Sequence, residues 1–219
     1  MLKRDDLKPE QIEKIVADAR AAGYDFFLTQ EEREASLKQA LDQYAPGEEA
    51  WVFAYGSLMW NPGFKTPETQ PARLHGFHRA FCIYSEHYRG TPKKPGLILG
   101  LLAGGSCRGL AHRLPAQSYQ KVRRYLWQRE IENDGVYVEE VRTLHLADGR
   151  SVPSLVYLAD RAHRQFAGKL PLAKSVALVR QGKGATGSNI DYVRNTVAHM
   201  RELGLSDKTL EELAQRASL

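Results

Sequence analysis

Glu130 is the residue of this sequence best suited to acid–base chemistry. It extends the apolar face of a predicted helix that begins at Pro115, a face that also carries Tyr119, Val122 and Leu126 at helical spacing. It also falls near the C-terminal end of that helix, where the macrodipole disfavours a negative charge. Because partial burial and the dipole both disfavour ionisation, we expect a raised pKa for Glu130, which suits a general base and acid near neutral pH.

The second candidate site is the end of an apolar strand. The segment "WVFAY", Trp51–Tyr55, runs directly into Gly56 and Ser57 and then into the apolar residues Leu58–Trp60. Glycine lets the backbone turn sharply and approach a ligand closely. Successive N–H groups in such a turn form a concave anion site, and the Ser57 hydroxyl adds a donor. The loop is therefore predicted to hold a carboxylate or an oxyanion, with a simple tight turn as the alternative.

Other kinds of site fit the sequence less well. Ser57 lies outside any G-x-S-x-G pattern, so a triad hydrolase is not expected. The seven histidines form no H-x-x-x-H or H-E-x-x-H pattern, so no metal site is expected. Cys82 and Cys107 are interpreted as buried apolar residues of a protein in a reducing compartment, which predicts a cytoplasmic location. Three further acidic residues are interpreted as solvated charges: Glu132, Glu139 and Glu140.

The charge is unevenly distributed along the 219 residues, whose net charge is +5. Residues 1–50 carry 7 basic and 12 acidic side chains, whereas the remainder carries 24 basic and 14 acidic ones. The basic residues are scattered, so nucleic-acid binding is not expected, and a small anionic substrate accounts for the positive charge equally well. No apolar run approaches the roughly 20 residues that a membrane span needs, so no membrane partner is expected.

The elements that must position Glu130 and the Gly-Ser loop are mostly short strands. Strands are predicted over residues 51–55, 73–84, 97–103, 108–114, 136–147 and 151–159, the last two joined by a hairpin turn at Asp148-Gly149. Helices are predicted over residues 9–22, 30–44, 115–130, 171–181 and 189–203, followed by a short amphipathic tail. Capping boxes mark two of these helices, at Thr29-x-x-Glu32 and at Ser188-x-x-Asp191.

These segments predict an α+β fold, a small mixed β-barrel or curled sheet flanked by helices. The strands and helices do not alternate regularly, which argues against a doubly wound sheet. Residues 1–48 are predicted to be a helical N-terminal extension, because so short a segment seldom sustains its own core. Residues 49–219 are predicted to form the main domain. The polar segment Ser85–Gly96 is interpreted as a mobile loop, with a lid and a solvated linker as open alternatives.

Taken together, the motifs resemble those of the ChaC family of γ-glutamylcyclotransferases, in its glutathione-specific branch. The resemblance covers about residues 50–217 in consistent order. Its motifs are Y-G-S-L-x-W-N-P-G-F at Tyr55–Phe64, R-G-x-P-x-x-P-G at Arg89–Gly96, G-x-A-(Y/H)-R-L-P at Gly109–Pro115, R-E at Arg129-Glu130 with an aromatic residue at Tyr137, and G-x-x-G-x-N-x-x-Y at Gly184–Tyr192.

The resemblance implies a γ-glutamylcyclotransferase-like fold and an intramolecular aminolysis of glutathione to 5-oxoproline and Cys-Gly. Glu130 would act as general base and general acid. The residues implied in substrate binding are Tyr55, Gly56, Ser57, Leu58, Tyr137 and Tyr192. No metal, nucleotide or other cofactor and no covalent intermediate is implied.

Two alternatives remain open at this point. The protein could be a cyclotransferase for other γ-glutamyl amines, although the Y-G-S-L form of the loop favours glutathione by resemblance. It could also be a binding module that holds small anionic peptides without turning them over. The sequence does not predict an oligomeric state.

Overall fold

The computed structural model describes residues 17, 21, 29–42, 49–131 and 135–218. The chain forms two compact units. We call them the barrel unit, Phe26–Arg79 with Ala103–Asp160, and the helical unit, Met1–Asp25 with Ala80–Leu102 and Arg161–Leu219. The helix predicted over residues 9–22 lies almost wholly outside the described residues. The boundary predicted after residue 48 also falls there and stays a prediction.

Five strands close a mixed barrel, as the sequence predicted. Their order around the barrel is β1-β3-β2-β4-β5, with the bounds β1 Trp51–Ala54, β2 Thr69–Ser85, β3 Gly96–Arg113, β4 Tyr137–Leu146 and β5 Ser151–Ala159. β1 is fully buried and has a partner on each side. Val52 pairs with His112 of antiparallel β3 and with Leu155 of parallel β5. The strand that leads into the Gly-Ser loop is therefore central.

The main difference from the predicted strands is the length of β3; β2 also begins four residues earlier than predicted, and the short strands of a hairpin at residues 183–188 were not predicted. The two strands predicted over residues 97–103 and 108–114 are one 18-residue strand. Gly104 and Gly105 lie in the middle of it with φ values of 99° and 72°, a conformation that glycine adopts at little cost. The two glycines, which separate the two predicted strands in the sequence, therefore lie within a continuous strand. The predicted Asp148-Gly149 turn does join β4 to β5, and Gly149 has a φ of 93°.

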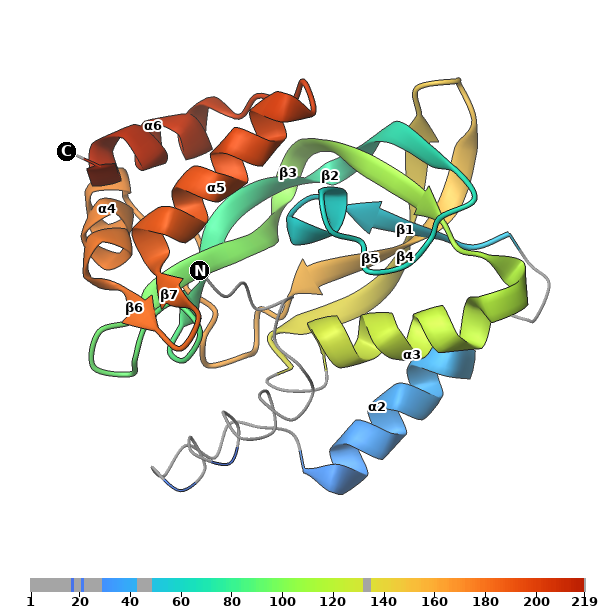
Figure 1. Ribbon diagram of the computed structural model, residues 1–219, viewed down its shortest axis with the longest axis horizontal. Coiled ribbons are helices and arrows are strands. Elements are labelled where there is room, and N and C mark those ends of the chain that lie inside the picture. Colours follow the sequence, from blue (N-terminus) through green and yellow to red (C-terminus); the bar gives the residue numbers. More distant parts are fainter. Residues whose placement is uncertain (1–16, 18–20, 22–28, 43–48, 132–134, 219) are drawn as a thin grey trace. The chain divides into compact units, whose positions relative to one another are not determined.

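Two helices belong to the barrel unit. α3, Tyr119–Glu130, follows the short 3-10 helix η3, Ala116–Ser118. α2, Gln30–Asp42, begins with the predicted capping box. The Thr29 N–H donates to Glu32 at 2.7 Å, and the Glu32 N–H donates to the Thr29 hydroxyl at 3.2 Å. α2 packs alongside α3 (Figure 1).

Within residues 161–218, the helical unit has three helices that pack against one another and a short hairpin. Their bounds are α4 Leu172–Gln181, β6 Lys183–Gly184, β7 Gly187–Ser188, α5 Asn189–Glu202 and α6 Lys208–Ser218. The Ser188 hydroxyl accepts a bond from the Asp191 N–H at 3.2 Å, which confirms the second predicted cap. In the described part of the chain, no helix has the length and apolarity that a membrane span requires.

The segment Ser85–Gly96 is bound to the rest of the helical unit over most of its length. The N–H groups of Ala185 and Thr186 donate to the carbonyls of His87 and Tyr88, each at 3.0 Å. Arg89 is buried, and its Nη1 donates to the Thr186 carbonyl at 2.6 Å. The segment is therefore not a solvated linker, because its first half is packed against the β6–β7 hairpin.

Candidate active site

The Gly-Ser loop folds back into the barrel unit as a single 3-10 turn. η2, Ser57–Met59, has Gly56 at its N-terminus, and the Met59 N–H donates to the Gly56 carbonyl at 2.9 Å. Leu58 and Met59 are buried. Their burial explains why this loop is apolar: the two side chains anchor it in the barrel unit. The first N–H groups of such a turn have no partner within the turn, so they can donate hydrogen bonds to an anionic group from outside it.

Two buried side chains hold the backbone, one just before this turn and one within it. Arg79 donates from Nε to the Tyr55 carbonyl at 2.6 Å and from Nη2 to the Arg108 carbonyl at 2.7 Å. His112 lies with Nε2 3.1 Å from the Leu58 carbonyl and Nδ1 3.0 Å from the Thr69 hydroxyl. Because a carbonyl can only accept, we assign the Nε2–H tautomer to His112, with Thr69 donating to Nδ1.

His112 should make folding stability depend on pH. Burial lowers its pKa, while the bond to the Leu58 carbonyl opposes that change. As pH falls below about 6.5, the unfolded chain takes up a proton before the folded one, so stability present above that pH is lost. The slope from this one group is at most about 1.4 kcal/mol per pH unit. We expect urea unfolding of His112→Gln to depend less on pH between 7 and 5 than that of the wild type. If the free energy of unfolding changed equally with pH in the variant and in the wild type, His112 would not have this role.

Glu130 is the last residue of α3, as the sequence predicted, and its side chain is 14% exposed. Its Oε1 lies 3.1 Å from Nε of Arg129. The sequence argument considered burial and the helix dipole but not this cation, which favours the ionised carboxylate. An ionised carboxylate can act as a proton acceptor, and the raised pKa expected for Glu130 from the sequence stays a prediction.

Arg129 connects Glu130 to the Gly-Ser loop. Its Nη2 donates to the Ser57 hydroxyl at 2.8 Å, and its Nη1 donates to the Asn61 carbonyl at 2.7 Å and to the Tyr125 hydroxyl at 2.9 Å. The guanidinium is only 7% exposed. One side chain thus contacts both the loop and the carboxylate, so a single guanidinium joins the two features that the sequence identified separately.

Gly63 explains why the loop can reach α3. Its φ is +77°, and a Cβ at this position would lie 1.9 Å from the Tyr125 hydroxyl. A larger residue would therefore be strained and would displace the tyrosine that holds Arg129.

The two predicted tyrosines lie in different units. Tyr137 is the first residue of β4 in the barrel unit, pairs with Ala159 and is buried. Tyr192 lies on α5 in the helical unit, where its ring meets Phe81 edge-on with centroids 6.0 Å apart. The Arg89 guanidinium lies 5.1 Å from the Tyr192 ring centroid.

Glu139 is not a solvated charge, and the sequence interpretation was wrong for it. Its side chain is 3% exposed and forms a two-pronged ion pair with Arg123, with both bonds at 2.7 Å. It faces inward because it lies opposite Tyr157 in the β4–β5 pairing, and the Tyr157 hydroxyl donates to it at 2.8 Å. Glu140 is 38% exposed and pairs with Arg142, as expected for a solvated charge. Glu132 lies outside the described residues.

Sequence reasoning missed four residues that surround the loop and Glu130: Arg79, His112, Arg123 and Arg129. A signal existed for Arg123, which stands between Val122 and Leu126 on the apolar side of α3. A charged residue within a buried stripe requires a buried partner of opposite charge. Arg129 was quoted as part of a motif but was given no role.

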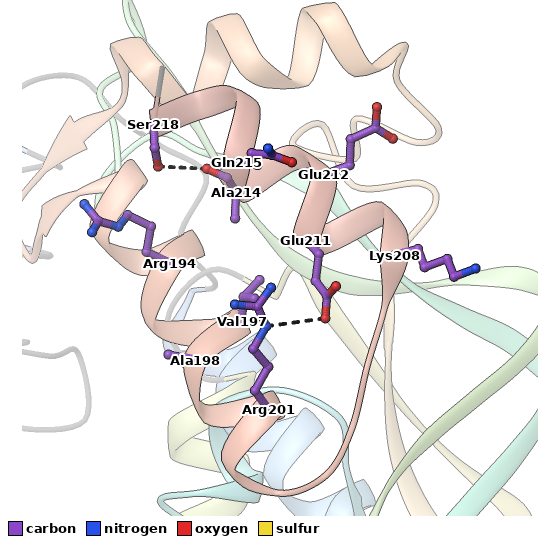
Figure 2. Close-up of a pocket in the computed structure, with 10 residues that line it drawn as sticks. All are labelled: Arg194, Val197, Ala198, Arg201, Lys208, Glu211, Glu212, Ala214, Gln215 and Ser218. Carbon is purple, nitrogen blue, oxygen red and sulfur yellow. Dashed lines mark hydrogen bonds and ion pairs between the residues drawn. The ribbon is translucent and has the colours of Figure 1, made fainter.

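Other candidate sites in the described residues offer less. No group of three His, Cys, Asp or Glu side chains there is arranged to hold a metal ion. Both cysteines are buried, as predicted, and burial raises the pKa of the Cys82 thiol to about 12. A pocket of about 670 Å³ lies between α5 and α6 (Figure 2). Charged side chains line it, including Arg201 and Glu211 with 3.5 Å between their nearest charged atoms, and it contains none of the residues predicted for the site.

Comparison with known proteins places the chain in a family. The family model for ChaC-like proteins matches residues 50–218, so the chain belongs to this family.

Individual relatives agree with this assignment. The glutathione-specific gamma-glutamylcyclotransferase of Escherichia coli K12 is 34% identical over 183 residues, covering 84% of this chain and 79% of the relative. The protein of the same name from Schizosaccharomyces pombe is 28% identical, covering 76% of this chain and 90% of the relative. The crystal structure of a yeast gamma-glutamylcyclotransferase specific to glutathione has the same fold. Its TM-score is 0.70 at 21% identity, covering 78% of this chain and 96% of the yeast one.

Proposed function

We propose that this protein is a glutathione-specific γ-glutamylcyclotransferase, an enzyme that converts glutathione to 5-oxoproline and Cys-Gly. The observation that carries the proposal is the pair of contacts made by Arg129, 3.1 Å to Glu130 and 2.8 Å to Ser57. They bring a proton acceptor and a loop with backbone donors to one place. The names of the relatives from Escherichia coli and Schizosaccharomyces pombe support glutathione as the substrate.

The first step is removal of a proton from the substrate. The α-ammonium of the γ-glutamyl group, with a pKa of about 8, must become an amine before it can attack. Glu130 accepts that proton, since Arg129 favours its ionised form before the substrate binds. Arg129 keeps two of its bonds on the loop, so it remains fixed while Glu130 changes charge.

The second step closes a five-membered ring. The amine nitrogen attacks the γ-carbonyl carbon of the same molecule, and the carbonyl oxygen becomes an oxyanion. The loop at Gly56–Leu58 supplies N–H donors, either for this oxyanion or for the substrate's α-carboxylate. Glu130 gives its proton to the cysteine nitrogen as the bond to that nitrogen breaks. It then takes the second proton from the ring nitrogen, which leaves the lactam N–H of 5-oxoproline, and passes it to the departing amine of Cys-Gly. No water is consumed, and Glu130 returns to its starting state.

The remaining predicted residues act on substrate position. Because attacking and attacked groups belong to one molecule, the enzyme gains most by holding the glutamyl chain bent. In this proposal Tyr137 orients the chain from the start of β4. A role for Tyr192, which belongs to the helical unit, stays a prediction of the family resemblance alone. The cytoplasmic location likewise remains a prediction from the sequence.

A panel of substrates tests the function. Purified protein is incubated with glutathione, with several γ-glutamyl amino acids and with a γ-glutamyl amine that lacks the glycine carboxylate, and 5-oxoproline is quantified by mass spectrometry. We expect 5-oxoproline and Cys-Gly from glutathione and at least about tenfold lower kcat/KM for the others. Similar rates on all substrates would indicate a broader cyclotransferase. Binding of glutathione without any 5-oxoproline would indicate a binding module.

Ser57→Ala should have only a moderate effect. It removes the hydroxyl that accepts from Arg129 but leaves the backbone N–H groups and the other bonds of Arg129 in place. A hydrogen bond worth about 1 kcal/mol predicts a roughly fivefold rise in KM with kcat nearly unchanged. Steady-state kinetics would measure this, with Ser106→Ala, an exposed serine of β3, as control. Complete loss of turnover at unchanged affinity would mean that the hydroxyl takes part in the chemistry.

A further inference from the structure

The helix α2 lies outside the region matched by the family model, yet it contacts the helix that carries Glu130 (Figure 1). Two polar contacts hold it there. The Ser36 hydroxyl accepts from the Trp127 indole N–H at 3.0 Å, and the Ala40 carbonyl accepts from Nη2 of Arg123. Both partners lie on α3, within two turns of Glu130.

The Ala40 carbonyl is well placed to bind a cation. It belongs to the last turn of α2, whose carbonyls have no partner within the helix and carry the negative end of the helix dipole. Ala40 itself is buried. The C-terminal end of α2 therefore provides a fixed, desolvated acceptor aimed at the Arg123 guanidinium.

Arg123 depends on that acceptor because it is completely buried. Its side chain is 0% exposed, and among the described residues its Nε has no hydrogen-bond partner. Burial opposes its charge, but the bonds and charge of Glu139 outweigh burial and raise the pKa of Arg123. Ala40 and Glu139 together therefore fix the guanidinium: one from α2, the other from β4.

Two hydrogen bonds, both made by Tyr157, link Glu139 to Tyr55 at the start of the Gly-Ser loop. The Tyr157 hydroxyl donates to Glu139 at 2.8 Å, and the Tyr157 main-chain carbonyl accepts from the Tyr55 hydroxyl at 2.8 Å. Tyr55 immediately precedes Gly56. Burial raises the pKa of Tyr157 well above its usual value, with further contributions from Glu139 and, among the smaller ones, from Glu130. Glu130 therefore lies within electrostatic reach of this chain.

We propose that α2 is a positioning element of the active site: its C-terminal end fixes Arg123, and Arg123 fixes the Glu139–Tyr157–Tyr55 chain that sets the Gly-Ser loop against Glu130. In this proposal Arg123, Glu139 and Tyr157 act without touching the substrate. Their effect comes through geometry, since a misplacement of about 1 Å can lower a rate by about a hundredfold. The inference rests on the proposed function for its kinetic readout but not for its structural one.

A matched pair of variants tests the role of α2 in the full-length protein. Ala40→Arg puts a large charged side chain at a buried position and should displace the helix end, whereas Gln39→Arg adds the same charge at the neighbouring exposed position. For Ala40→Arg we expect kcat for glutathione to fall by about 10- to 100-fold, with KM changed less than about threefold. We also expect faster amide hydrogen exchange in residues 55–61. Gln39→Arg should match the wild type in all three measurements.

A second set of variants separates positioning from stability. Arg123→Met leaves the buried Glu139 without its cationic partner and should lower both kcat and the unfolding temperature. Adding Glu139→Gln removes that uncompensated charge, so we expect the unfolding temperature to recover largely while kcat stays low and exchange in residues 55–61 stays fast. Arg123→Lys keeps the charge but not the two-pronged geometry, and should give an intermediate kcat.

The results that would overturn the inference are distinct from those that would overturn the function. Recovery of kcat together with stability in the double variant would make the network purely structural. Wild-type kcat and wild-type exchange in Ala40→Arg would remove α2 from the active site. If the wild-type protein released no 5-oxoproline, the proposed function would fail, and the exchange rates of residues 55–61 would still decide whether α2 positions the loop.

Discussion

Glu130→Gln should lower kcat for glutathione by about 10²- to 10⁴-fold, the usual contribution of a general acid–base group, while KM changes little. Glutamine has nearly the same shape and can keep a bond with Arg129, so the fold and the loop should be preserved. It cannot accept the proton of the α-ammonium, so the substrate amine stays protonated and the ring does not close. Release of Cys-Gly, measured by mass spectrometry, is the direct readout.

Glu140→Gln provides the matched control for this variant. Glu140 is an exposed glutamate in the barrel unit, and its partner Arg142 is also exposed. Its replacement should leave kcat and KM unchanged. If Glu130→Gln turned over glutathione at a near-normal rate, Glu130 would have no part in the proton transfers, and the proposed mechanism would fail.

Arg129→Met should have the second largest effect, about a hundredfold loss of kcat/KM. The change removes the cation beside Glu130 and three hydrogen bonds, to Ser57, Asn61 and Tyr125. Without the guanidinium the ionised carboxylate is less favoured. The acid limb of the pH profile of kcat/KM should therefore move to higher pH, in addition to the loss of rate at the optimum.

Arg129→Lys distinguishes the two contributions of Arg129. Lysine keeps a positive charge but cannot bond the loop and Glu130 together through a planar fork. We expect the acid limb to stay near its wild-type position while kcat/KM still falls. Arg124→Met, which removes an exposed arginine of the same helix, is the control and should leave kcat/KM and its pH profile unchanged. An Arg129→Met enzyme with a wild-type rate and a wild-type pH profile would show that the contacts of Arg129 with Ser57 and Glu130 have no part in catalysis.

Features determined by neighbouring residues could be predicted from the sequence. The caps at Thr29 and Ser188 and the turn at Gly149 depend on residues within three positions of one another. The helix ending at Glu130 is marked by its apolar periodicity. The barrel class followed from the irregular order of strands and helices. Each of these signals is local, so one sequence suffices to read it.

The contacts that organise the site could not be predicted in the same way. Arg129 and Ser57 are 72 positions apart, and Arg123 and Glu139 come from a helix and a strand whose register only the folded barrel determines. Glu139 and Glu140 are adjacent and chemically identical, yet one is buried and the other exposed. Strand alternation predicts that neighbours face opposite sides but not which one faces inward.

The most direct test of the central claim is a crystal structure of the Glu130→Gln protein with glutathione bound. The account predicts that the α-amino nitrogen lies within about 2.6–3.2 Å of the side-chain oxygen or nitrogen of residue 130. It also predicts that the γ-carbonyl oxygen or the α-carboxylate is bonded to N–H groups of Gly56–Leu58. A glutathione molecule bound with its α-amine directed away from residue 130 and no contact with that loop would contradict it.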